Sequence, residues 1–262
     1  MRVLIGTQRV VDGLSFNVFP GERVCLLGAS GSGKSLTAGA ILGLLPASAC
    51  AQGSIRVQGR EVIDLPAARR PIDVRVGMVF QDSFSALNPL VSIGSQLQEP
   101  FRRLHDLSPR AALQAAIELL DAMALPDPGQ IVRRSPAELS GGQRQRVCIA
   151  LALACKTPLL VADEPTTALD VVTQAQVLRV LKESTGRTGT PALLFITHDL
   201  CAASELCERA IVIERGTLVE SNRVDALIAD PQHSFTRELV AAARDGIGLA
   251  PRATEPTLAA GA

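Results

Sequence analysis

The chain has 262 residues, of which 47% are apolar and 20% charged, a composition typical of a soluble globular protein that can bury a sizeable core. Lys plus Arg and Asp plus Glu each total 26, so the net charge gives no reason to expect nucleic acid as a partner. The six cysteines contain no Cys-x-x-Cys pair or zinc-ligand spacing and are expected to be reduced. No signal peptide is recognisable, and no apolar run approaches the ~18 residues of a membrane helix. We therefore expect a cytosolic protein that serves a membrane, if at all, as a peripheral subunit.

Apolar patterns predict four strands and one helix in the first eighty residues. Two strands have alternating apolar residues broken by Pro20-Gly21 or Gly59-Arg60, which is typical of antiparallel sheets. A third is apolar and enters a glycine-rich loop, and the fourth ends at Gln81. The helix is predicted over residues 35–45, where Pro46 stops it. In chain order the four strands are residues 14–24, 23–27, 54–62 and 74–80.

Residues 93–134 have a helical pattern. Ser108 followed by Pro109 predicts a helix start, because serine caps helices and proline is favoured at the first position. One face of this helix is then predicted to carry Leu113, Ile117, Leu120 and Ala124. The sequence Ser-Pro-Ala-Glu at residues 135–138 predicts a capping box. The block from about 93 to 135 is therefore predicted to be a helical insert in a strand-rich core.

The second half alternates strand and helix, which is typical of a parallel sheet. Strands are predicted at residues 159–162 and 192–197, a helix at 173–183, and a hairpin at 210–219. The Ala-rich segment 248–262 is expected to be a flexible tail. We therefore expect a single α/β domain whose core is formed by residues 1–92 and 136–247.

A glycine-rich loop lies between a predicted strand and a predicted helix. Residues 28–35, Gly-Ala-Ser-Gly-Ser-Gly-Lys-Ser, match the pattern G-x-x-x-x-G-K-[ST] in the context that it requires. Its glycines let successive N–H groups turn towards one centre, which forms an anion nest at a helix N-terminus. Lys34 would reach the β- and γ-phosphates of a nucleotide, and the Ser35 hydroxyl would bind Mg²⁺.

Two carboxylates follow the apolar strand at residues 159–162. A buried strand can deliver Asp163 to a metal ion while Glu164 polarises a water molecule against a γ-phosphate. Acids at strand ends also cap helices, so this interpretation depends on the phosphate loop.

The sequence Leu-Ser-Gly-Gly-Gln at residues 139–143 predicts a second anion-binding helix end. Ser140 can cap the helix that begins after it, and Gly141 and Gly142 leave the N-terminal amides accessible. A simple helix start is the alternative. Since one nucleotide does not need two such sites, we expect the second to serve a nucleotide held by another molecule.

These motifs occur in the order found in ABC ATPases, and the chain resembles that family along essentially its whole length. The phosphate loop is followed by Gln81, residues 139–143, Asp163-Glu164, Ala168-Leu169-Asp170 and His198. The resemblance implies a P-loop NTPase fold with a RecA-like core, an antiparallel β-subdomain and an inserted α-helical subdomain. It also implies that two subunits hold two ATP molecules head to tail.

The resemblance implies a role for each matching residue. Gln81 is similar to the glutamine that reaches Mg²⁺ and the attacking water, Glu164 to the general base, and His198 to the histidine that contacts the γ-phosphate. Mg²⁺ would be bound by Ser35, Gln81 and Asp163. The residues expected to contact ATP, the last three on the partner's nucleotide, are Gly28, Ser30, Gly31, Ser32, Gly33, Lys34, Ser35, Leu36, Ser140, Gly142 and Asp170.

The adenine side departs from the family pattern. Family members usually carry an aromatic ring upstream of the phosphate loop, whereas alignment on residues 11–16 places Ile5 near that position. The chain also starts unusually close to this point. Either the adenine contact is weaker and aliphatic, or the start codon is assigned too late, and we favour the second.

Longer strings resemble the peptide/nickel importer ATPases, namely residues 80–82 with 87–89, 163–170 and 231–236. Residues 33–37 with 42–46 resemble the first of two paralogous ATPases, so a heterodimer with a second ATPase is expected. The resemblance also implies that the chain is a peripheral subunit at the cytoplasmic face of the inner membrane. The implied partners are two permease subunits and, indirectly, a periplasmic or extracellular substrate-binding protein. The cargo stays open between nickel, metal chelates and short peptides. The short ending without a cysteine after Cys207 favours the metal subgroup.

A non-transport ABC ATPase, of the DNA repair or cluster assembly type, is the alternative. Repair-type members carry long coiled coils or zinc modules, and the segment between Gln81 and Leu139 contains neither. A binding module without turnover is disfavoured because Glu164 is present.

Overall fold

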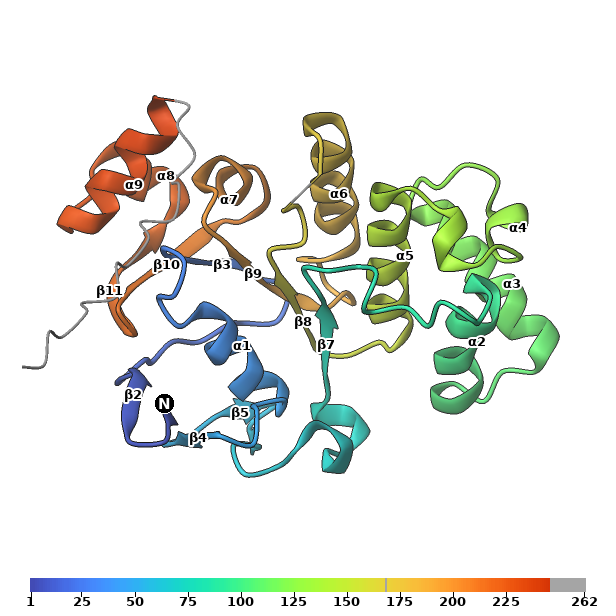
Figure 1. Ribbon diagram of the computed structural model, residues 1–262, viewed down its shortest axis with the longest axis horizontal. Helices are drawn as coiled ribbons and strands as arrows, with labels where there is room; N and C mark the ends of the chain where they lie inside the picture. The colour runs from blue at the N-terminus through green and yellow to red at the C-terminus, as the bar shows by residue number, and fades with distance from the viewer. Residues whose placement is uncertain (168, 246–262) are drawn as a thin grey trace, which may run out of the picture.

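The computed structural model describes residues 1–167 and 169–245, so Ala168 and the predicted flexible tail 248–262 lie outside the described residues. Within them, the centre of the molecule is a six-stranded sheet in the order β11-β10-β3-β9-β8-β7 (Figure 1). All neighbouring strands are parallel except β11, which pairs antiparallel with β10. The strands of this sheet are Val76–Val79 (β7), Leu159–Asp163 (β8), Ala192–Thr197 (β9), Arg23–Leu27 (β3), Arg209–Glu214 (β10) and Thr217–Arg223 (β11).

The central strands are apolar on both faces because other elements cover both faces of the sheet. Side chains alternate along a strand, so β3 directs Cys25 and Leu27 into one core cluster and Val24 and Leu26 into another. The strand β9 is buried at every position. This two-sided burial explains why continuous apolar runs identified β3, β8 and β9 in the sequence.

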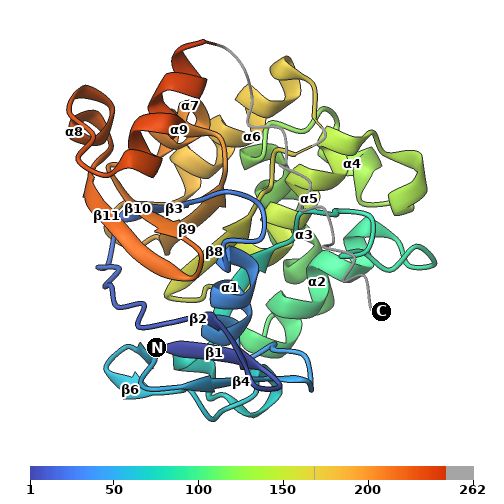
Figure 2. The same ribbon diagram turned by 60° about the vertical axis from the view of Figure 1, so that its left-hand side comes forward.

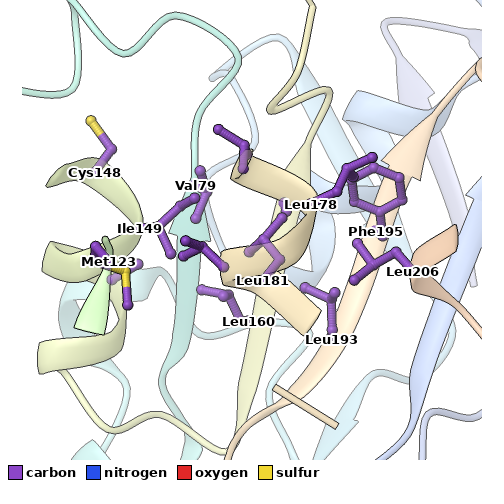
Figure 3. Close-up of a cluster of buried hydrophobic side chains, with 14 of the residues drawn as sticks. Val79, Met123, Cys148, Ile149, Leu160, Leu178, Leu181, Leu193, Phe195 and Leu206 are labelled. Carbon is purple, nitrogen blue, oxygen red and sulfur yellow. The ribbon is translucent and has the colours of Figure 1, made fainter. Parts of the chain in front are cut away.

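Helices cover the face of the sheet that carries Cys25. Figure 3 shows Leu160, Leu193 and Phe195 of the sheet in one apolar cluster with Leu178 and Leu181. Removal of apolar surface from water contributes about 25 cal/mol per Å², so this cluster is a main source of stability. The helices of this face are Gly141–Ala154 (α5), Val171–Ser184 (α6), Leu200–Leu206 (α7), Val224–Ala229 (α8) and Ser234–Arg244 (α9).

The opposite face is covered by helix α1 (Lys34–Leu42), with a small antiparallel sheet below it (Figure 2). Its order is β2-β1-β4, and Val3 and Val11 join the core there. A separate two-stranded ladder, β5-β6, comes next in the chain. The remaining elements are Arg2–Ile5 (β1), Gln8–Val11 (β2), Ala49–Gln52 (β4), Arg56–Val57 (β5), Arg60–Glu61 (β6) and the 3₁₀ turns Ala67–Arg69 (η1) and Ile72–Val74 (η2).

A group of helices lies at one end of the molecule, beside α5 (Figure 1). Its members are Ile93–Leu104 (α2), Pro109–Ala122 (α3), Pro128–Ile131 (α4) and the 3₁₀ turn Pro136–Glu138 (η3). The buried guanidinium of Arg146 on α5 joins the group to the core. It donates hydrogen bonds to Ala124 O at 2.7 Å, just beyond α3, and to Gly142 O at 3.3 Å.

Several sequence predictions are wrong in detail. Residues 14–22 form no strand, and β1, β2 and β4 were not predicted. Helix α1 ends at Gly43 rather than at Pro46, because Gly43 has a φ of 72° and a Cβ there would lie 2.7 Å from Leu65 O. The buried face of α3 is formed by Ala112, Ala116 and Leu120, while Leu113 is 37% exposed. The capping box of residues 135–138 is present, but it opens a 3₁₀ turn instead of an α-helix.

Replacing Arg146 with methionine is expected to destabilise the protein. The substitution nearly keeps the buried volume but leaves the Ala124 carbonyl without its side-chain donor, at a cost of about 1–3 kcal/mol. Urea denaturation would measure this as a lower midpoint. The matched control is Arg110→Met on the exposed side of α3, expected to change stability by less than about 0.5 kcal/mol. Equal midpoints for the two variants would contradict the role assigned to Arg146.

Candidate functional site

The glycine-rich loop leaves the end of β3 and enters α1, as the sequence predicted. Gly33 stands at the helix N-cap with a φ of 100°, and a Cβ there would lie 3.0 Å from Val11 Cγ2. At Gly28 a Cβ would lie 2.5 Å from Ile213 O. Both positions therefore require glycine for steric reasons. The first amides of α1 are left to face an anion, since no side chain caps the helix.

Lys34 is almost completely buried at the start of α1, with 5% of its residue surface exposed. Its ammonium donates to Gly28 O at 2.7 Å and Ala29 O at 2.9 Å, and it lies 4.0 Å from Glu164 Oε1. Burial lowers the pKa of Lys34, while the charges of Glu164 and Asp163 act in the opposite direction. The positive charge is thus held at the mouth of the loop, facing two acids.

Asp163 ends β8 and its carboxylate is incompletely satisfied. Within the described residues, its Oδ1 atom is buried without a hydrogen-bond partner. Burial raises the pKa of Asp163, and the hydroxyl of Ser35 lowers it. A buried carboxylate oxygen without a partner, next to a serine hydroxyl, is the oxygen chemistry that Mg²⁺ prefers. The residues present therefore fit a magnesium ion.

The neighbouring residue Glu164 has a strained backbone, with a φ of 46° that is uncommon outside glycine. Its N–H donates to Ile196 O at 2.9 Å, which holds the residue at the sheet edge. Its Oε1 lies 3.3 Å from His198 Nδ1, and its Oε2 accepts from the Thr167 hydroxyl at 3.0 Å. The carboxylate is therefore held from both sides.

Lys34, Ser35 and Glu164 line one open cleft of about 360 Å³, whereas Asp163 and His198 are not among its lining residues. Gln81, which comes just after β7, lines the same cleft. Two strands, β9 and β8, separate β7 from β3, the strand that leads into the phosphate loop. Several predicted site residues are thereby brought together. The cleft is lined by Val10, Ser30, Gly31, Gly33, Lys34, Ser35, Leu36, Gln81 and Glu164.

The second predicted anion site is a separate structure. Ser140 caps α5 by accepting from Gln143 N at 3.3 Å, and Gln143 Oε1 accepts from Ser140 N at 3.0 Å. Asp170 caps α6 by accepting from Thr173 N at 3.0 Å. A Cβ on Gly142 would lie 2.1 Å from Thr173 Cγ2, so the two helix ends touch. Ser140, Gly142 and Asp170 do not line the cleft of the phosphate loop.

Two residues of the site were not singled out by their sequence. Thr167 holds the Glu164 carboxylate, and its place three residues later in the chain was the available signal. Val10 lines the phosphate cleft, whereas Ile5, the residue placed near the adenine by alignment, is 39% exposed and does not line it.

Comparisons with known proteins agree with this geometry. The family model described as "ABC transporter" matches residues 11–167. The chain is 43% identical over 235 residues to the probable D,D-dipeptide transport ATP-binding protein DdpD of Escherichia coli, covering 88% of the chain and 71% of DdpD. It is 46% identical over 230 residues to the oligopeptide transport ATP-binding protein OppD of Mycobacterium tuberculosis, covering 86% of the chain but only 37% of OppD.

Among solved structures, the dimeric post-hydrolysis state of the ATP-binding cassette MJ0796 bound to ADP and Pi matches with a TM-score of 0.71. The identity is 29%, over 85% of this chain and 95% of the other. Across residues 1–167 and 169–245, no helix is both long enough and apolar enough to span a membrane. The fold is that of an ABC cassette in the P-loop NTPase class, and the chain belongs to the ABC transporter family.

Proposed function

We propose that this protein is the ATP-binding and ATP-hydrolysing subunit of an ABC importer for short peptides. One observation carries the proposal. The ends of β3 and β8 bring the buried ammonium of Lys34 and the carboxylate of Glu164 to within 4.0 Å of each other. The phosphate loop supplies the site for the nucleotide, and the carboxylate supplies a base beside it.

In the proposed mechanism, the loop amides and Lys34 bind the phosphates of ATP. Lys34 first exchanges its bonds to Gly28 O and Ala29 O for phosphate oxygens. Mg²⁺, held by Ser35, Asp163 and Gln81, would neutralise phosphate charge. Glu164 orients the attacking water and accepts its proton, and His198 contacts the γ-phosphate.

The helix ends of α5 and α6 suggest the second half of the site. Ser140, Gly142 and Asp170 do not line the phosphate cleft of the chain to which they belong. We therefore propose that they contact the ATP bound by a second ATPase subunit. Val171 and Val172, beside Asp170, are 83% and 68% exposed, which favours burial against that subunit. The dimeric MJ0796 cassette supports the arrangement. We propose a paralogous ATPase as the partner.

The segment after Gln81 is the proposed contact with two permease subunits, at the cytoplasmic face of the inner membrane. Phe84 is 49% exposed and Leu90 92% exposed in this segment. It is also joined to α5, because Cys148 Sγ donates to Ser83 O at 3.6 Å, and just before the segment Gln145 Nε2 donates to Phe80 O at 3.2 Å. Movement of the segment would therefore displace α5, the helix that begins after Ser140. This linkage is the proposed lever between ATP hydrolysis and the permease.

The similarity to DdpD and OppD favours short peptides as the cargo, delivered by a substrate-binding protein. Nickel, which the sequence strings left open, is not specifically supported by these relatives. The chain spans 71% of DdpD and 37% of OppD, so the activity of the whole assembly is part of the proposal.

The variant Glu164→Gln is expected to bind ATP but to hydrolyse it at least about 100-fold more slowly, because a general base contributes about 10²–10⁴-fold. It is also expected to form a stable ATP-bound dimer with its partner. ATP titration, single-turnover kinetics and light scattering would measure the three properties. Glu183→Gln, on an exposed turn of α6, is the matched control. Multiple rapid turnovers by Glu164→Gln would refute the assignment.

The variant Thr167→Val is expected to lower kcat about tenfold with little change in KM. The substitution removes the hydrogen bond to Glu164 Oε2, whose loss at about 1.4 kcal/mol corresponds to that factor. Thr167→Ser keeps the hydroxyl and should restore most of the rate. An unchanged kcat in Thr167→Val, or an equal loss in Thr167→Ser, which keeps the hydroxyl, would contradict this role.

Reconstitution tests the transport function. The chain with its paralogous ATPase and permease pair in proteoliposomes should take up dipeptides when ATP is supplied, and peptide-loaded binding protein should stimulate ATP hydrolysis. Phe84→Asp should abolish this stimulation while leaving the basal ATPase rate within about twofold, because the side chain is exposed and does not line the phosphate cleft. Uptake of Ni²⁺ alone would contradict the peptide assignment.

A further inference from the structure

His198 lies in the short turn between β9 and α7. Its side chain is 40% exposed, and its Nδ1 atom lies 3.3 Å from Glu164 Oε1. Within the described residues, neither the N–H nor the carbonyl of its own backbone makes a hydrogen bond. The position of the His198 ring therefore depends on the two residues beside it in the chain, Thr197 and Asp199.

Thr197 and Asp199 close the turn around His198. Thr197 is the last residue of β9 and is buried, so the sheet fixes its place. The N–H of Asp199 donates to Thr197 Oγ1 at 3.0 Å. Since this hydrogen bond spans His198, the turn keeps its shape only while Asp199 stays in place.

The Asp199 carboxylate contacts both α7 and α6. Its Oδ1 atom caps α7 by accepting from the N–H groups of Cys201 at 2.8 Å and Ala202 at 3.2 Å. Its Oδ2 atom accepts from Gln174 Nε2 at 3.2 Å, and in the described part of the chain this amide is the sole partner of Oδ2. Helix α7 follows His198 directly and would move with the turn. Gln174 belongs to α6, so it holds the turn against a separate element.

Gln174 is a fixed anchor because α6 is packed on the core. The residue lies in the first turn of α6, where its backbone N–H donates to Asp170 O at 2.8 Å. Further along the helix, Leu178 and Leu181 are buried in the main apolar cluster. The side chain of Gln174 is half-buried, and across residues 1–167 and 169–245 its amide makes no hydrogen bond other than the one to Asp199.

We propose that Gln174 is a positioning residue for ATP hydrolysis, which acts through Asp199 to hold His198 beside Glu164. The inference rests on the proposed role of His198 at the γ-phosphate. Gln174 does not line the phosphate cleft, so its loss is expected to slow the chemical step and to leave nucleotide binding unchanged. Without the Gln174 amide, the Asp199 carboxylate can turn towards solvent, and the His198 ring can move away from Glu164.

The alternative is a hydrogen bond that only joins α6 to α7. Apolar packing already joins these helices, since Leu181 of α6 and Leu206 of α7 lie in the same buried cluster (Figure 3). A single hydrogen bond between partly exposed groups adds little to the stability of such a contact. Its place on the residue that follows His198 is what favours the positioning role.

The first experiment compares Gln174→Met with Gln176→Met, a matched control at an exposed position of the same helix. Methionine keeps the length and the helix propensity of glutamine but cannot donate a hydrogen bond. In ATPase assays with the paralogous ATPase, Gln174→Met is expected to lower kcat about three- to tenfold, the range that the loss of one hydrogen bond supplies. The KM for ATP should stay within about twofold, and Gln176→Met should change neither constant.

A reversed pair tests the hydrogen bond itself. Gln174→Glu places a second carboxylate opposite Asp199, so it should lower kcat at least as far as Gln174→Met. When Asp199→Asn is added, the new amide can donate to the new carboxylate, and its oxygen can still cap α7. The double variant is expected to recover most of the lost rate. A double variant as slow as Gln174→Glu alone would overturn the proposal.

The chain has only 3 histidines, so NMR can follow the His198 ring directly, with His198→Ala to assign its signals. Gln174→Met is expected to shift the His198 ring signals and to leave those of His105 and His233 unchanged. Unmoved His198 signals, or equal shifts at all the rings, would overturn the positioning role of Gln174. A wild-type kcat for His198→Ala would instead overturn the proposed role of His198 in hydrolysis, so the two failures are distinguishable.

Discussion

The parallel register of β3, β9 and β8 is the constraint on which the site depends. Leu27 is level with Thr197, and Ile196 is level with Asp163, so three strands end together. The segments that leave these strand ends must then share a small space. They are the phosphate loop after β3, Glu164 after β8 and His198 after β9. The apolar residues of these strands are buried on both faces, so the register cannot slip without exposing a core.

Several groups at these strand ends are buried or strained in the absence of a ligand. Lys34 is a buried cation, Asp163 has a buried oxygen without a partner in the described residues, and Glu164 has a left-handed backbone. The Asp163 oxygen and the Glu164 backbone each cost free energy of order 1–3 kcal/mol in the absence of a ligand, whereas the Lys34 ammonium is hydrogen-bonded to Gly28 O and Ala29 O. The packed faces of the surrounding sheet offset that cost. Phosphates and a metal ion would satisfy the same groups, so the strain favours the liganded state.

The positions of the candidate site residues could be predicted from the sequence where those residues belong to one continuous motif. Residues 28–35 and the pair Asp163-Glu164 lie where their motifs indicated, because strand, loop and helix signals are local. The short strands β1, β2 and β4 were missed, since four-residue strands at the edge of a small sheet carry little periodicity. Residues 14–18 show the opposite error, because a strand pattern cannot state whether a partner is present. The contact of His198 with Glu164 depends on strand register and could not be predicted from the sequence of either segment.

The N-terminal ends of α1 and α5, the two helix ends proposed to bind phosphate, differ in how they are held. The start of α1 follows β3 directly and is packed against Ile213 of the central sheet at Gly28 and against Val11 of β2 at Gly33. The end of α5 is instead held by Thr173 on α6 and, one turn along, by Arg146. Arg146 reaches the helical group through Ala124 O, and Gln145 reaches the segment after β7 through Phe80 O. We propose that a displacement of that segment would be transmitted to the end of α5, while the end of α1 would stay with the sheet.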